Sequence, residues 1–155
     1  MQPLIEYAQQ ALDRHWERYR AVVRALPAEG LNWRPGDETT NSLAMIVRHV
    51  TFGQRLILNM ALGNPPTLPI DERTRGLHND PATHDGLLRL LDSAAEARRK
   101  LLTQLDALDL TETVSGPIGS PRPRFSFAAH SVAEAAEHIG HAELTRQLWE
   151  QRSGQ

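Results

Sequence analysis

The sequence contains no cysteine, which excludes disulfide bonds, thiolate metal ligands and a cysteine nucleophile. It also has no apolar run that approaches the ~20 residues of a membrane-spanning helix. The first ten residues, MQPLIEYAQQ, lack the basic stretch and apolar core of a secretory signal. We therefore expect no membrane partner and a cytoplasmic location. A thiol that takes part in chemistry here would have to belong to another molecule.

An excess of positive charge is missing as well. The 17 lysines and arginines face 19 aspartates and glutamates, so the formal net charge is -2 with neutral histidines. This balance excludes a large basic footprint for nucleic acid and gives no polybasic patch for an anionic membrane. The sequence also lacks a phosphate loop, a dinucleotide fingerprint and a nucleophile elbow. The 155 residues, of which 40% are hydrophobic, fit a single domain over 1–155 with its own core.

Helical periodicity is what the chain does have, in four segments separated by proline- and glycine-containing connections. No run of alternating apolar residues predicts a strand. Four helices of roughly 20 residues, each about 30 Å long, predict an all-α, up-and-down four-helix bundle. Ser42 or Asn41 and Thr83 are the expected caps of the second and third helices. The predicted ranges are 3–26, 41 or 42–62, 84–108, and 126 or 131–151.

Polar side chains form a single stripe along the last predicted helix. At about 100° per residue, His130, His138 and His141 lie within about 40° of Glu134 around the helix axis. Glu134 and His138 are four residues apart, so both can reach one point beside the helix, as paired metal ligands do in helical bundles. If the helix is rotated slightly, Glu137 and His141 form an equally spaced pair.

The second predicted helix supplies a third candidate ligand. His49 lies on an apolar face between Ile46 and Met60, so we expect it to point inward. A buried imidazole needs partners for its nitrogens, and a metal ion satisfies one of them. Three protein ligands leave a position open for water or substrate, as in catalytic sites. His130 and His141 could then relay a proton beside the ion.

Simpler interpretations stay open at this point. Ser131 and Glu134 have the spacing of a capping box and could merely begin the last helix. His49 could be a hydrogen-bonded core residue, and Arg98, inside an apolar stripe, could pair with a buried carboxylate or bind an anionic substrate group. The polar stripe would face solvent if the core packed against the opposite, apolar face of the helix, formed by Val132, Ala135, Ile139 and Ala142.

Two stretches resemble the DinB-like superfamily, near its branch of mycothiol-dependent enzymes. They are LNWRPGDETTNSLAMIVRHV (31–50) and HSVAEAAEHIGHAELTRQ (130–147). The resemblance implies a four-helix bundle with a three-ligand divalent metal site. Its ligand positions fall on His49, on His138 in the His-x-Gly of the last helix, and on Glu134 four residues earlier. The resemblance places His141 near the site.

The function that the resemblance implies is that of a metal-dependent enzyme acting on a small-molecule substrate. Zinc or nickel suits two histidines and a carboxylate and would activate a thiol or a water. The leading expectation is a thiol-S-transferase-like activity on small electrophiles, with a low-molecular-weight thiol as cosubstrate. A metal-dependent hydrolase and a non-catalytic stress-response protein that binds a metal or a small molecule are the alternatives. A homodimer that pairs through its helices is the expected assembly.

Overall fold

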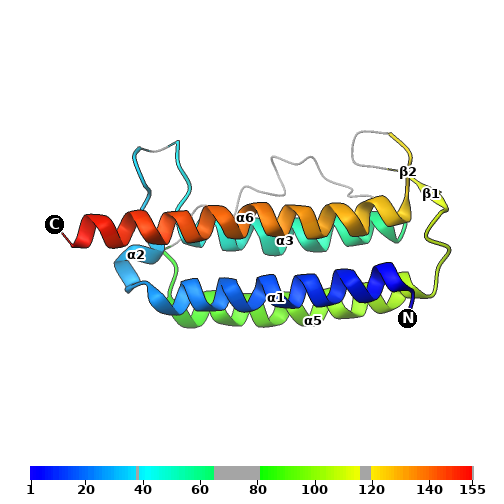
Figure 1. Ribbon diagram of the computed structural model, residues 1–155, viewed down its shortest axis with the longest axis horizontal. Coiled ribbons are helices and arrows are strands. Elements are labelled where there is room, and N and C mark those ends of the chain that lie inside the picture. Colours follow the sequence, from blue (N-terminus) through cyan, green and yellow to red (C-terminus); the bar gives the residue numbers. More distant parts are fainter. Residues whose placement is uncertain (38, 65–80, 116–119, 155) are drawn as a thin grey trace.

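Four long helices make up the protein in the computed structural model, which describes residues 1–37, 39–64, 81–115 and 120–154 (Figure 1). The predicted four-helix bundle is confirmed. Beyond it, the described residues hold a five-residue helix and a short antiparallel strand pair in front of the last helix, neither of which was expected. In chain order the elements are α1 (Pro3–Ala25), α2 (Ala28–Asn32), α3 (Leu43–Ala61), α5 (His84–Asp106), β1 (Thr113–Val114), β2 (Arg122–Pro123) and α6 (Arg124–Ser153).

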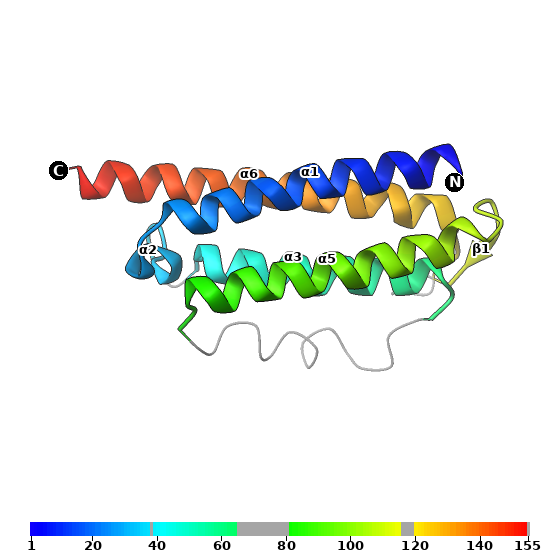
Figure 2. The same cartoon turned by 90° about the horizontal axis from the view of Figure 1, so that it is seen from below.

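The helices do not alternate strictly in direction along the chain. Helix α1 packs mainly against α5 and α6, and so does α3. Helices α1 and α6 run one way, whereas α3 and α5 run the other way (Figures 1 and 2). The C-terminal end of α3 and the N-terminal end of α5 consequently lie at opposite ends of the bundle (Figure 2). Four-helix bundles admit such parallel neighbours when a connection is long.

The core joins α1 to both of its neighbours through two aromatic side chains that are fully buried. The indole nitrogen of Trp16 donates a hydrogen bond to the carbonyl of Leu91 on α5 at 3.0 Å. The hydroxyl of Tyr19 donates to the carbonyl of Ala135 on α6 at 3.1 Å. Buried aromatic residues supply much apolar contact area, and these bonds satisfy their polar atoms. These two hydrogen bonds fix the register of α1 against α5 and α6. They thereby fix the position of α6 along the bundle axis.

Two of the helix starts lie where the capping residues predicted them. Ser42 Oγ accepts the backbone N–H of Met45 at 3.3 Å, and Thr83 Oγ1 accepts that of Gly86 at 3.1 Å. Each side chain satisfies one of the amides that a first helical turn leaves without an internal partner. Among the described residues, none of the helices combines the length and the apolar character needed to cross a membrane.

The start of the last helix predicted at 131 was wrong, whereas the one predicted near 126 lies two residues from the observed start. Helix α6 begins at Arg124, and Ser131 lies inside it, with its hydroxyl donating to the carbonyl of Ala128 at 2.9 Å. The capping-box interpretation of Ser131 and Glu134 is therefore also wrong. The first amides of α6 bind carbonyls of the preceding segment instead of a capping side chain: Arg124 N lies 3.0 Å from Glu112 O, and Phe125 N lies 2.9 Å from Leu110 O. Tertiary contacts of this kind leave no local sequence signature.

Candidate metal centre

Three side chains from two antiparallel helices converge at the seam between α3 and α6. His49 Nε2 lies 3.3 Å from Glu134 Oε1, and His138 Nε2 lies 3.4 Å from the same oxygen. One ligand atom from each residue lies within 4.8 Å of the other two. The imidazole rings of His49 and His138 meet edge to face, with centroids 4.6 Å apart. His49, Glu134 and His138, the metal triad below, thus form a His/His/Glu cluster that could hold a metal ion.

The packing of α6 explains how this triad stays partly open to solvent. The apolar face of α6 does face the core, since Ala135 and Ile139 are fully buried. The Glu134/His138 part of the polar stripe nevertheless does not project into bulk water, because it borders α3. The side chains of Glu134 and His138 are 20% and 21% exposed, and that of His49 is 44% exposed. The expectation that His49 points inward was wrong. Other residues of α3 face the core instead, among them Val47 and Val50.

A glycine on α3 lets the backbone of that helix approach Glu134. Gly53 is buried and lies one turn beyond His49, and a Cβ at this position would be 3.5 Å from Glu134 Oε1. That distance is an ordinary van der Waals contact, so alanine would just fit, whereas a longer side chain would meet the carboxylate. The sequence alone does not point to Gly53 as part of the site. Its clearance for Glu134 depends on the packing of α6, which the sequence does not reveal.

The electrostatics of the triad favour a bound cation. Hydrogen bonding to His138, and then to His49, holds the pKa of Glu134 well below the 4.5 of an ordinary glutamate, although burial acts in the opposite direction. The carboxylate is therefore ionised at neutral pH. Two imidazole nitrogens and a carboxylate oxygen are donors that zinc and other borderline divalent metals accept. The residues present thus fit a divalent ion in both charge and donor type.

The other polar residues of α6 surround the triad at greater distance. His130 Nε2 lies 3.9 Å from Glu134 Oε2, the oxygen that faces away from the triad contacts, and the side chain is 52% exposed. The ring of His141 lies 5.5 Å from that of His138, centroid to centroid. Glu137 is exposed. The structure therefore brings His49 to the Glu134/His138 pair, while the proton-relay roles of His130 and His141 stay predictions.

Arg98, the charged residue in the α5 stripe, pairs with a carboxylate as one of its two interpretations expected. Its Nη2 contacts Asp13 Oδ1 on α1, and its guanidinium carbon lies 4.5 Å from the ring centroid of Trp16. Asp13 is about one-third exposed, so the partner is not a fully buried group. Arg98 lies in the α1/α5 contact, whereas the triad lies at the seam between α3 and α6.

Comparisons with known proteins found a matching family model and a similar fold. The family model of the DinB superfamily matches residues 11–142, a span that contains the whole triad. Among solved structures, a conserved protein from Enterococcus faecalis is similar over 92% of this chain and 95% of that chain, with a TM-score of 0.72 and 17% sequence identity. At that identity the likeness concerns the fold alone. Among curated proteins, none matches this sequence.

Proposed function

The chain belongs to the DinB superfamily, and from this premise we propose that it is a metal-dependent enzyme acting on small molecules. The observation that carries the proposal is the metal triad, whose ligand atoms lie within 4.8 Å of one another. Three protein ligands leave a coordination position for water or substrate, whereas structural zinc sites are closed by four. The partial exposure of His49 keeps that position within reach of solvent.

A divalent ion in this site, zinc or nickel, would lower the pKa of a bound thiol or water and provide a nucleophile near neutral pH. The residues of the chain provide the remaining parts of the mechanism. His49 and His138 would hold the ion from two helices, and the ionised Glu134 would neutralise part of its charge. His130 is our candidate proton acceptor, supported by its position 3.9 Å from Glu134 Oε2 and by its half-exposed side chain.

Transfer of a thiol sulfur to a small electrophile is the reaction we propose first. Because the chain has no cysteine, the sulfur must come from another molecule, and we propose a low-molecular-weight thiol cosubstrate. The S–C bond forms at the electrophilic carbon while the bond from that carbon to the leaving group breaks, and the leaving group departs with the electron pair. The thiol proton passes to His130, to His141 or to solvent.

Metal analysis combined with turnover assays tests the proposal. Untagged protein loaded with zinc or nickel should retain about one ion per chain, and His49→Ala should retain less than about 0.2. The loaded protein should conjugate glutathione, cysteine or mycothiol to 1-chloro-2,4-dinitrobenzene faster than the metal-free protein does. Metal-dependent ester hydrolysis without conjugation would replace the transferase with a hydrolase. Stoichiometric metal without either activity would contradict the enzyme and favour a binding protein.

A further inference from the structure

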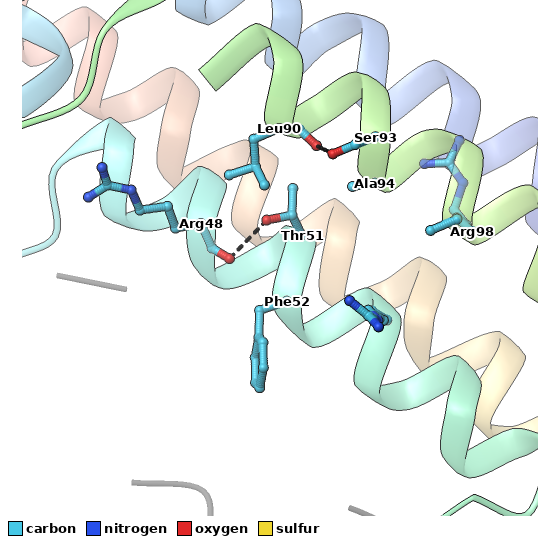
Figure 3. A pocket seen from close by; sticks show the side chains of 9 residues that line it. Arg48, Thr51, Phe52, Leu90, Ser93, Ala94 and Arg98 are labelled. Carbon is cyan, nitrogen blue, oxygen red and sulfur yellow. Dashed lines mark hydrogen bonds between the residues drawn. The ribbon is translucent and has the colours of Figure 1, made fainter. Parts of the chain in front are cut away.

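A second candidate site lies on another flank of α3, away from the metal triad. A cavity of about 460 Å³ opens between α3 and α5. Figure 3 shows side chains of both helices around it, with Thr51 of α3 facing Leu90 and Ala94 of α5. This volume lies within the range of small-molecule sites, which are roughly 300–1,000 Å³. Its size therefore suits a ligand such as a substituted aromatic ring.

The lining of the cavity combines apolar surface with positive charge. Phe52, Leu90 and Ala94 give it an apolar wall, and three arginines border it, whereas the described lining contains no aspartate or glutamate. Two of these arginines, Arg55 and Arg98, carry the argument. Arg55 is exposed, and within the described part of the chain its guanidinium has no hydrogen-bond partner. It is therefore available to a ligand at the mouth of the cavity.

Arg98 contributes positive electrostatic potential to the cavity from behind its apolar lining on α5. Its side chain is 2% exposed, and its guanidinium lies behind α5 (Figure 3). There it meets Asp13 and Trp16 of α1. Its Nε and Nη1 are buried and have no hydrogen-bond acceptor among the described residues. Burial lowers the pKa of Arg98 to about 10 from 12.5, because one partly solvated carboxylate does not offset the loss of water. An anion held nearby would relieve part of that cost.

We propose that this cavity binds a small organic anion, with an apolar body against Phe52, Leu90 and Ala94 and a carboxylate directed toward Arg55. Apolar contact provides most of the affinity. The charge of the exposed Arg55 adds little binding energy, but it favours anionic over neutral or cationic ligands. The site needs no metal ion. The proposal of this anion site therefore does not depend on the function proposed for the triad.

Calorimetric titration of the metal-free protein with three matched probes tests the charge preference. The probes are 4-phenylbutyrate, 4-phenylbutan-1-ol and 4-phenylbutylamine, which share one apolar body and differ in the charge of the head group. We expect the carboxylate to bind about tenfold more tightly than the alcohol, and the amine to bind most weakly. Equal affinities for the three probes, or no binding of the carboxylate, would overturn the proposal.

Variants locate the binding within the molecule. Arg55→Gln should weaken 4-phenylbutyrate about tenfold and leave the alcohol unchanged. Ala97→Leu, which fills the cavity from α5, should weaken both probes. The matched control is Arg89→Gln, an exposed arginine of α5 outside the lining, which should change neither. His49→Ala should bind the carboxylate as the parent does, and loss of binding there would assign the anion to the triad. Carboxylate affinity that survives both cavity variants would also contradict the site.

Discussion

The Cβ that Gly53 lacks would lie 3.5 Å from Oε1 of Glu134. The same oxygen is the one that both triad histidines approach. The backbone of α3 therefore packs directly beside the ligand atom at the centre of the cluster. The shape of the candidate metal site depends on a position that contributes no side chain at all.

Lengthening the side chain at position 53 should separate metal binding from folding. Gly53→Ala places a methyl group at ordinary contact distance and should keep zinc affinity, while helix propensity raises the free energy of unfolding by up to about 1 kcal/mol. Gly53→Leu should displace Glu134 and weaken zinc about tenfold or more, because a carboxylate shifted by an ångström no longer completes the site. Competition with a chromophoric chelator measures the affinity.

Gly140 provides the matched control for this change. It lies in α6 two residues after His138, and a Cβ there would meet no atom within 4 Å. Gly140→Leu should therefore leave zinc affinity within about twofold of the parent, and Gly140→Ala should stabilise α6 by a similar helix-propensity gain. Unchanged zinc affinity in Gly53→Leu would show that Glu134 is not a ligand.

Removing the α3 histidine should abolish metal binding without unfolding the bundle. The side chain of His49 is 44% exposed, so His49→Ala removes little packing and should cost less than about 1 kcal/mol. Zinc affinity should fall about a hundredfold or more, because only two ligands on one helix remain. His130→Ala is the comparison, since His130 lies 3.9 Å from the outer oxygen of Glu134 and should affect zinc less than tenfold. Helical circular dichroism should be the same for both variants and the parent.

The pairing of Glu134 with His138 was predictable from sequence because it is local. Residues four apart on a helix share a face, and the helix itself followed from periodicity. The caps of α3 and α5 were predictable for the same reason, since Ser42 and Thr83 each bind an amide three residues away. These features require only the geometry of a single helix.

Features that depend on two elements could not be found in this way. The buried Arg124 donates to the carbonyl of Ala61 at 2.6 Å and to Glu112 Oε2 at 2.8 Å. These contacts anchor the start of α6 two residues before Ser126 and seven before Ser131, the two starts that the sequence suggested. The parallel arrangement of α3 and α5, the exposure of His49 and the clearance at Gly53 likewise follow from how helices meet. Periodicity along one helix does not specify that.

Acid should remove the stability that the ionised Glu134 gives to the metal-free protein. The pKa of this carboxyl in the fold lies below the 4.5 of an ordinary glutamate. At pH values between the pKa of Glu134 in the folded protein and its pKa in the unfolded chain, the unfolded chain binds more protons. The free energy of unfolding therefore falls as pH decreases through this range. The contribution is complete above about pH 4.5 and declines below it.

Glu134→Gln tests this dependence in urea titrations with EDTA present. The parent should be more stable than the variant at pH 7, and the difference should shrink at pH 3.5. Glu137→Gln, on the exposed side of α6, is the control for loss of a carboxylate and should change stability by less than about 0.5 kcal/mol at pH 7. A stability difference between parent and Glu134→Gln that stays constant from pH 7 to pH 3.5 would contradict the prediction.

Replacing Arg98 by methionine should leave the protein as stable as the parent, or more stable. Methionine keeps the unbranched apolar stem of the side chain, and it removes a buried charge whose Nε and Nη1 have no acceptor among the described residues. Asp13 loses little, because it is about one-third exposed and still has Arg99 Nη2 at 3.1 Å from its Oδ1.

Arg98→Ala removes the packing as well and should lower the free energy of unfolding by about 2 kcal/mol or more. Urea titration at pH 7 compares the two. Equal losses for methionine and alanine would mean that the ion pair with Asp13, rather than packing, stabilises this contact between α1 and α5.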